Sequence, residues 1–226
     1  MRNYPDTLLD PARTVIAVID HQPQMYFGAA SAERRCIMNN AAMLMETAKV
    51  FGIPCILTTV EAKEFSGDMI CQLADIYPDV TPIDRTCINA WEDTKFRKAV
   101  EATGKREIIL AGLWTEACVT FPALAMRHDG YKVYACIDAC GGSSKAAHNA
   151  ALTRMSQAGV VQVTAQQCLL EFQRDWANKE TYDKVMQVVK EYGGAYGIGA
   201  EYAESMVQPQ GQKQQKQPQT AQPKSN

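Results

Sequence analysis

The stretch TVIAVID at residues 14–20 runs through five consecutive apolar residues and stops at the carboxylate of Asp20. Nearly unbroken apolar segments of this length are typical of strands in a parallel sheet that helices cover on both faces. A short strand is also predicted near residues 81–84. Four further segments share the apolar character of the first: residues 53–59, 107–112, 132–138 and 160–164.

Helical patterns fill the intervals between these strands. Gly52, Gly104, Gly130 and Gly159 each stand after a predicted helix and before a predicted strand, where a left-handed terminating residue is favoured. The alternation predicts an α/β fold, a three-layer α/β/α sandwich around a mostly parallel sheet of five to six strands with a Rossmann-like topology. The predicted helices span residues 32–51, 68–76, 93–103, 116–128, 145–158, 166–178 and 180–191.

Composition divides the 226 residues into four parts. Residues 1–13 are predicted to form an N-terminal arm, and residues 14–178 the α/β domain. Residues 179–207 are predicted to add a C-terminal helix and an arm that lies on a neighbouring subunit. Residues 208–226 are rich in Gln, Pro and Lys and cannot bury enough apolar area to offset the entropy of ordering, so a disordered tail is predicted there.

The charge balance favours a small-molecule partner over nucleic acid or a membrane. Lys and Arg number 23 against 25 Asp and Glu, the formal net charge is -2, and no basic run occurs. The sequence contains no run of ~20 apolar residues, and its first residues lack a signal-peptide pattern. It therefore predicts a cytoplasmic protein with a small, near-neutral substrate.

The cysteines stand at irregular spacings and form no CxxC pair. Such spacing predicts neither a disulfide framework nor a zinc knuckle. Most of these residues are expected to be small core hydrophobes. The eight cysteines are Cys36, Cys55, Cys71, Cys87, Cys118, Cys136, Cys140 and Cys168.

Ligands of open parallel sheets bind beyond the carboxyl ends of the strands, so the residues after each strand are the candidate site. The first strand is followed by DHQPQ at residues 20–24, without the Gly-x-Gly-x-x-Gly turn that admits a pyrophosphate. Neither a Gly-x-x-x-x-Gly-Lys-Ser/Thr loop nor a Gly-x-Ser-x-Gly elbow occurs anywhere in the sequence. These absences disfavour a Rossmann dehydrogenase, a P-loop NTPase and a serine α/β-hydrolase.

Cys118 is predicted to lie in the first turn of a helix that Thr115 caps. Unpaired backbone N–H groups and the positive end of the helix dipole favour a thiolate, the nucleophilic form of cysteine. The alternative interpretation is a buried small residue that packs the helix onto the sheet.

Asp20 and Arg85 are the two other polar candidates. A carboxylate at the end of a buried strand should be desolvated, which raises its pKa unless a cation lies nearby, and such a group suits proton abstraction from a thiol. Asp20 is equally compatible with a loop cap, and Arg85 alone with a surface arginine. The functional interpretation depends on the two residues acting together with Cys118.

In combination, these residues resemble the isochorismatase-like cysteine hydrolases. The resemblance rests on the apolar strand that ends in Asp20, on Arg85 four residues before NAW at residues 89–91, and on GLWTEACV at residues 112–119. It runs from about residue 14 to residue 176, and its detail is similar to the YcaC-like branch of that superfamily.

The resemblance implies a catalytic triad of Asp20, Arg85 and Cys118. Cys118 would attack a carbonyl or similar electrophilic carbon, and Asp20 would take the thiol proton and return it to the departing amine. The peptide between Leu113 and Trp114 matches a cis, non-proline bond of the family. That bond would aim the backbone N–H groups of Trp114 and Cys118 at a developing oxyanion.

Two features differ from other branches of the superfamily. Arg85 stands where lysine is usual, as it does in YcaC-like members, and arginine stabilises anions but cannot shuttle protons. The nicotinamidase branch carries Asp-x-His after the second strand, whereas this chain has TVEAK at residues 59–63, and its histidines His21, His128 and His148 stand far apart. Neither a metal nor another cofactor is expected, and His21 is interpreted as a packing residue beside the triad.

The expected substrate is a small amide or related C–N compound, hydrolysed through a cysteine thioester. Pocket walls are predicted from Gln22, Phe27, Asn89 and Trp91, with Trp114 as a further candidate. Each of these side chains is also compatible with packing in the core or at an interface.

Family members form closed oligomers, commonly tetramers or octamers, which implies a homo-oligomer here. Two other functions stay open at this point. One is an oligomeric scaffold or small-ligand-binding protein with little turnover, and the other is a redox-responsive protein in which Cys118 is the sensing thiol.

Overall fold

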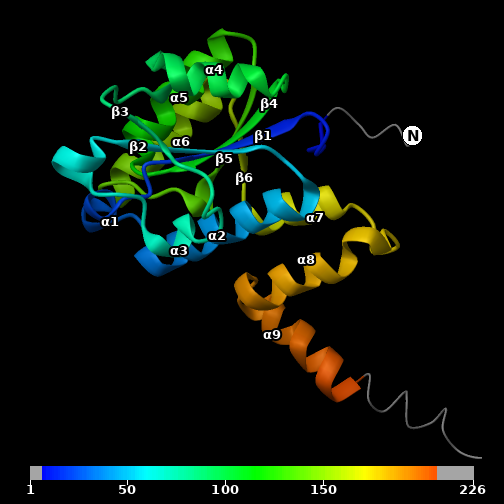
Figure 1. The fold of residues 1–226 in the computed structure, drawn as a ribbon. Coiled ribbons are helices and arrows are strands. Elements are labelled where there is room, and N and C mark those ends of the chain that lie inside the picture. The colour runs from blue at the N-terminus through cyan, green and yellow to red at the C-terminus, as the bar shows by residue number, and fades with distance from the viewer. Residues whose placement is uncertain (1–6, 208–226) are drawn as a thin grey trace, which may run out of the picture.

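The computed structural model describes residues 7–207, and its centre is a six-stranded parallel sheet (Figure 1). The strand order is β3-β2-β1-β4-β5-β6, so the chain direction across the sheet reverses between β1 and β4. A ligand crevice is expected at the carboxyl ends of those two central strands. The strands are β1 (Thr14–Ile19), β2 (Cys55–Val60), β3 (Ile83–Arg85), β4 (Glu107–Gly112), β5 (Lys132–Cys136) and β6 (Val161–Val163).

Helices cover both faces of the sheet, which confirms the predicted three-layer α/β/α architecture (Figure 1). One layer contains α4 (Thr94–Ala102), α5 (Thr120–His128) and α6 (Lys145–Gln157). The other contains α2 (Arg34–Phe51) and α7 (Ala165–Gln173), and α8 (Lys179–Tyr192) packs against α2.

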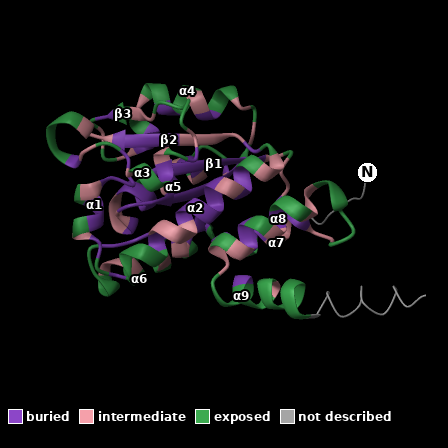
Figure 2. Ribbon diagram, turned by 60° about the horizontal axis from the view of Figure 1, so that its bottom comes forward, coloured by how far each residue is buried: buried purple, intermediate pink, exposed green. Residues whose placement is uncertain are grey.

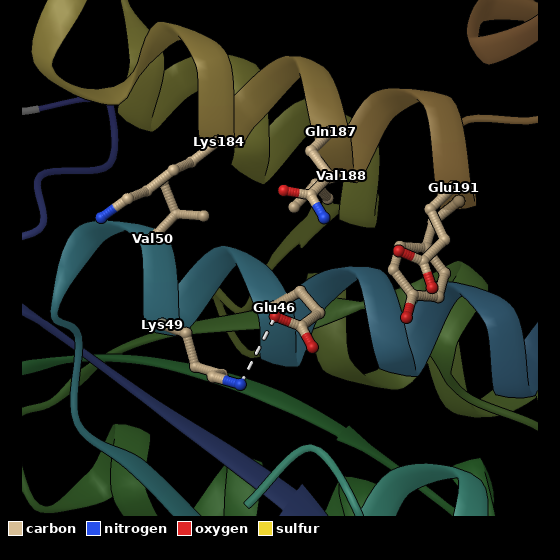
Figure 3. Close-up of a pocket in the computed structure, with 8 residues that line it drawn as sticks. Glu46, Lys49, Val50, Lys184, Gln187, Val188 and Glu191 are labelled. Atoms are coloured by element: carbon tan, nitrogen blue, oxygen red, sulfur yellow. Dashed lines mark ion pairs between the residues drawn. The ribbon is translucent and has the colours of Figure 1, made fainter.

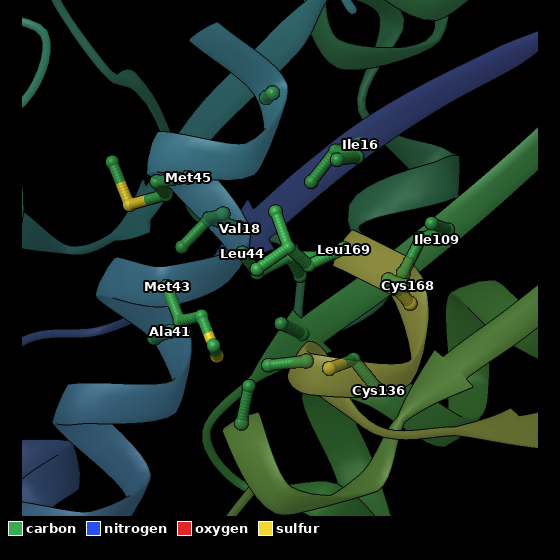
Figure 4. Close-up of a cluster of buried hydrophobic side chains, with 14 of the residues drawn as sticks. Ile16, Val18, Ala41, Met43, Leu44, Met45, Ile109, Cys136, Cys168 and Leu169 are labelled. Atoms are coloured by element: carbon green, nitrogen blue, oxygen red, sulfur yellow. The ribbon is translucent and has the colours of Figure 1, made fainter. Parts of the chain in front are cut away.

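The central strand β1 supplies side chains to both layers. Ile16 and Val18 point into the cluster beneath α2 and α7, whereas Val15, Ala17 and Ile19 belong to the cluster on the opposite face. Figure 4 shows Ile16 and Val18 meeting side chains of α2, β4 and α7. Full burial on both faces explains why this strand has no polar side chain between its ends.

Four of the eight cysteines are buried, which confirms the prediction of core cysteines for Cys136, Cys140 and Cys168 and agrees with it for Cys118. The prediction is wrong for Cys36 and Cys71, which are exposed. All eight thiols are free.

Several shorter elements connect the layers near the carboxyl edge of the sheet. The helix predicted at residues 68–76 is reduced to the four residues of α3 (Cys71–Ala74), and α1 (Pro23–Gly28) was not predicted. Further short turns are η1 (Ala62–Ser66), η2 (Ala90–Glu92), η3 (Thr115–Val119) and η4 (Ile137–Ala139).

The continuous helix predicted at residues 116–128 is wrong at its start. A π-helical turn, η3, precedes α5, which begins at Thr120. Pro122 has no N–H with which to bond the carbonyl of Cys118, so a regular α-helix cannot run through both residues. Pro122 instead occupies the first turn of α5, where a proline is tolerated.

The two ends of the described chain differ in how they are held. Leu9 is fully buried, and its N–H donates to Glu171 of α7 at 2.9 Å. The predicted C-terminal arm is helical: α9 (Ala195–Tyr202) continues into η5 (Ala203–Val207) and extends away from the α/β body with a mostly exposed surface (Figure 2). The predicted disordered tail, residues 208–226, lies outside the described residues.

Within residues 7–207, no helix has both the length and the apolar character that crossing a bilayer requires.

Candidate active site

Asp20, Arg85 and Cys118 come together at the carboxyl edge of the sheet. Asp20 follows β1, Arg85 ends β3, and Cys118 lies in η3, which follows β4. Asp20 adopts a left-handed backbone with φ of 55°, a conformation that aspartate tolerates better than most residues. This conformation ends the strand and turns the chain into α1.

Asp20 and Arg85 form a fully buried ion pair. Nη2 of Arg85 donates to Oδ2 of Asp20 at 2.6 Å, and neither side chain is exposed to solvent. Nη1 of Arg85 donates to the carbonyls of Cys87 and Ile88, which fixes the guanidinium in place. A buried charge pair with these additional hydrogen bonds is costly to disrupt, because removing one partner leaves the other charge uncompensated.

Asp20 also lies close enough to Cys118 for each group to shift the pKa of the other. Burial raises the pKa of Asp20 from 3.8 to about 6, against the opposing attraction of Arg85. Burial and the negative charge of Asp20 raise the pKa of Cys118 from 9.0 to about 12. At neutral pH the resting pair is therefore a carboxylate next to a neutral thiol.

The resting thiol corrects the expectation of a thiolate at a helix N-terminus. Trp114, not Thr115, is the cap residue, and η3 continues directly into α5. The dipole at the start of this helical segment favours the thiolate. Burial and the neighbouring carboxylate outweigh it, and the Cys118 proton stays on sulfur.

The Trp114 N–H lies next to the thiol. The peptide bond between Leu113 and Trp114 is cis, and the Trp114 backbone is close enough to Cys118 to lower the pKa of its thiol in part. Within the described residues, no main-chain carbonyl accepts from the N–H of Trp114. This donor is thus not committed to another part of the main chain.

A comparison with protein families identifies residues 14–167 as an isochorismatase domain. The chain belongs to the isochorismatase family. The matched segment spans β1 to α7 and contains the Asp20, Arg85 and Cys118 cluster.

Among curated members of the isochorismatase family, the chain is 37% identical over 175 residues to the probable hydrolase YcaC of Escherichia coli K12, covering 77% of this chain and 84% of YcaC. The mouse isochorismatase domain-containing protein 2A is 27% identical over 156 residues, covering 69% and 73% of the two chains. These similarities place the chain with the YcaC-like hydrolases.

Solved structures agree with this family assignment. YcaC of Pseudomonas aeruginosa, determined with hexane-2,5-diol and covalent acrylamide, has a TM-score of 0.82 at 29% identity and covers 92% of this chain and 100% of its own. The Escherichia coli YcaC, described as an octameric hydrolase of unknown specificity, has a TM-score of 0.83 at 33% identity, covering 89% and 99%.

The side chains predicted to form pocket walls have different environments in the structure. Gln22 is fully buried, and its amide exchanges hydrogen bonds with the backbone of Val60 and donates to the carbonyl of Gly67. Phe27 in α1 is 73% exposed and free to contact a ligand or another chain. The Trp114 indole donates to the carbonyl of Met25 at 2.8 Å and so packs under α1.

Asn89 and Trp91 are committed to structural contacts. The Asn89 side chain accepts from the Trp91 N–H and so caps η2. The Trp91 indole donates to Asp129 at 2.7 Å, packs edge-on against Tyr131 and is 2% exposed. Their part in substrate binding stays a prediction, and Phe27 and Trp114 are the more accessible candidates.

His21 is a packing residue in this structure. Its ring is fully buried, and Nδ1 lies 2.7 Å from the hydroxyl of Tyr26 in α1. Burial lowers the pKa of His21 to about 3, so the ring is neutral throughout the physiological range and is no acid–base partner for Cys118.

Two contributors to the site were not predicted from the sequence. A Cβ at Gly28 would lie 2.3 Å from Cζ2 of Trp114, so only glycine lets the indole pack against α1. His148 in α6 contacts Thr115, next to the cis peptide. Gly28 could have been noticed in the sequence, because it ends the short segment after Pro23. The role of His148 could not, because it depends on a contact between residues 33 apart.

Other hollows of the surface lie apart from the triad. The pocket in Figure 3, of about 370 Å³, is formed by side chains of α2 and α8 and includes the Glu46–Lys49 ion pair. None of its lining residues belongs to the strand ends that carry the triad. Within residues 7–207, no three His, Cys, Asp or Glu side chains group as a metal site.

Proposed function

We propose that this chain is a cysteine hydrolase that cleaves a small amide or related C–N compound through a thioester on Cys118. The observation that carries the proposal is the position of Asp20, which forms a buried ion pair with Arg85 and lies next to Cys118, so that its charge raises the pKa of the thiol. A nucleophile, a base and a group that orients the base are thereby aligned.

In the first step, the Cys118 sulfur attacks the carbonyl carbon while Asp20 accepts the thiol proton. The pKa of Asp20, about 6, lies well below that of Cys118, about 12, so a free transfer of the thiol proton to the carboxylate is uphill. We therefore expect proton transfer to accompany formation of the S–C bond. This is general-base catalysis by Asp20.

The carbonyl oxygen becomes an oxyanion that accepts hydrogen bonds from the N–H groups of Trp114 and Cys118. The tetrahedral intermediate then collapses, the C–N bond breaks, and Asp20 returns the proton to the leaving amine. Water attacks the resulting thioester with Asp20 again as the base, which releases the acid and restores the thiol. Arg85 cannot move protons at working pH and acts by holding the Asp20 carboxylate.

Two further findings support the proposal. The Pseudomonas aeruginosa YcaC structure contains covalent acrylamide, and acrylamide adds to nucleophilic thiols. The raised pKa of Cys118 argues against the redox-responsive alternative, because oxidation proceeds through an accessible thiolate.

The test is turnover of a panel of small amides by the wild type, Cys118→Ala and the matched control Cys36→Ala, which removes an exposed cysteine. We expect turnover to be lost only in Cys118→Ala, and quenched reactions to show an acyl adduct on the Cys118 peptide. Turnover that survives in Cys118→Ala would refute the thioester. A wild type without turnover on any amide would favour the scaffold or ligand-binding alternative.

We also propose that the chain forms a closed homo-oligomer with α9 at a contact between copies. Ile198, Tyr202 and Met206 recur every four residues and are 71%, 61% and 55% exposed, an apolar stripe that a free helix would leave in water. The related Escherichia coli YcaC is an octamer. By light scattering, we expect the wild type to be a tetramer or an octamer. The double variant Ile198→Ser with Tyr202→Ser should form a smaller species, and the control Glu201→Gln should match the wild type. Cytoplasmic location stays a prediction.

A further inference from the structure

The segment from Trp114 to Cys118 is held by a network that the catalytic steps do not use. Thr115, the first residue of η3, is fully buried between the cis peptide and Cys118. Its N–H donates to the carbonyl of Gly141 at 3.0 Å, and its carbonyl accepts from the hydroxyl of Thr120 at 2.6 Å. The backbone of this residue is thus fixed on both sides.

The third fixed point is the side chain of Thr115. Its Oγ1 lies 2.8 Å from Nδ1 of His148, which is half-buried in the first turn of α6. Burial lowers the pKa of His148, so the ring is neutral at neutral pH. A neutral imidazole nitrogen and a hydroxyl can pair in either donor order.

The neighbouring residue, Glu116, makes a parallel connection to the same loop. Its Oε1 accepts from the N–H of Ser143 at 3.0 Å. A Cβ at Gly142 would lie 2.8 Å from the other carboxylate oxygen and 3.0 Å from the Cβ of His148, so only glycine permits this close packing. The start of α6 therefore contacts η3 through two consecutive side chains.

We propose that His148 is a positioning residue that, through Thr115, sets the direction of the Trp114 and Cys118 N–H groups. The inference rests on the proposed function, since these groups matter only where an oxyanion forms. Among the described residues, the hydrogen-bond partner of the His148 side chain is Thr115 rather than Cys118 or Asp20. Misplacement of preorganised donors by an ångström is sufficient to cost ~100-fold in rate.

The predicted consequence separates two reactions of the same thiol. Iodoacetamide alkylates Cys118 by displacement of iodide, a reaction in which no oxyanion develops. Propionaldehyde adds reversibly: the S–C bond forms, the carbonyl π bond breaks, the thiol proton passes to Asp20, and the resulting oxyanion accepts hydrogen bonds from the backbone donors. Protection of Cys118 from iodoacetamide by propionaldehyde therefore measures the oxyanion site without any substrate.

The test variants are His148→Ala and Thr115→Val, which remove the side-chain contact. His148→Asn returns a polar group near the position of Nδ1, and His128→Ala is a control at an exposed histidine. We expect His148→Ala and Thr115→Val to weaken protection by about 10- to 100-fold, with the alkylation rate without aldehyde unchanged. His148→Asn should recover most of the protection, and His128→Ala should match the wild type. Where an amide substrate is found, kcat should fall with KM nearly unchanged.

Three outcomes overturn the inference. Equal protection in all variants would show that His148 has no positioning role, while the proposed hydrolase would stand. A parallel fall in protection, alkylation rate and Tm, without recovery in His148→Asn, would show a merely structural role. Absence of protection in the wild type would contradict an oxyanion site, and if Asp20→Asn also left alkylation unchanged, the proposed function itself would fail.

Discussion

The ionisation of Asp20 gives a stability prediction whose sign is set by the structure. The perturbation is Asp20→Asn, which removes the titrating group but retains its shape and one hydrogen-bond acceptor for Arg85. The quantity of interest is the free energy of unfolding of the wild type minus that of the variant, followed as pH changes.

Burial raises the pKa of Asp20 from 3.8 to about 6. Between these values the folded protein holds a proton that the unfolded chain has released. Stability from this carboxyl is fully present below pH 3.8 and is lost as pH rises through about 6. At about 1.4 kcal/mol per pH unit, the loss amounts to roughly 3 kcal/mol.

The free energy of unfolding of the wild type alone would not isolate Asp20, because His21 titrates in the opposite sense. The wild type is therefore compared with Asp20→Asn at each pH. The folded-state pKa of His21 is lowered from 6.5 to about 3, so the stability of the neutral ring is present above pH 6.5 and is lost as pH falls through about 3. His21 is present in both proteins, so its contribution largely cancels in the subtraction.

Urea unfolding followed by tryptophan fluorescence, from about pH 4 to about pH 7, measures the difference. The wild type should lose about 2 kcal/mol relative to Asp20→Asn over this range, whereas Asp183→Asn on the exposed face of α8 should show no such trend. A wild type that instead gains stability over the variant as pH rises would mean that Arg85 outweighs burial. The argument for Asp20 as a base with a raised pKa would then be wrong.

Two further predictions follow from the same geometry. Amide turnover should rise with pH through about 6 and then level, because Asp20 must be ionised to accept the thiol proton. A rise that continues to the titration range of a free thiol would show that a preformed Cys118 thiolate reacts. Gly28→Ala should lower stability by about 1–3 kcal/mol and reduce turnover, because its Cβ would lie 2.3 Å from Trp114. In the control Gly199→Ala, in α9, the new Cβ meets nothing within 4 Å, and thermal unfolding should show no loss of stability.

The strands were predicted well because their sequence pattern has a single physical cause. β1 and β4 are buried on both faces, so their apolar runs contain no interruption and their ends are visible where polar residues begin. β5 is two residues shorter than predicted, because η4 begins at Ile137 while the apolar pattern continues. An apolar pattern marks burial, and burial alone does not distinguish a strand from a turn.

The short elements near the site were not predictable from local patterns. α1 has six residues, too few to show the hydrophobic periodicity by which a helix is predicted from sequence. Contacts to distant parts of the chain hold it in place. The hydrogen bonds from Gln22 to the backbone of Val60 and Gly67 are of this kind. The contact between Thr115 and His148 likewise exists only after α6 has packed against η3.

The sequence predicts the position of the triad better than it predicts the protonation state of Cys118. Strand order brings the ends of β1, β3 and β4 to one edge, so proximity of Asp20, Arg85 and Cys118 follows from topology. The charge on sulfur depends on desolvation, which a local helix-start argument cannot estimate. In the structure, burial and the nearby Asp20 carboxylate keep the Cys118 proton on sulfur. A thiol held neutral in this way is less prone to oxidation at rest, and in the proposed mechanism it becomes nucleophilic only where Asp20 can accept its proton.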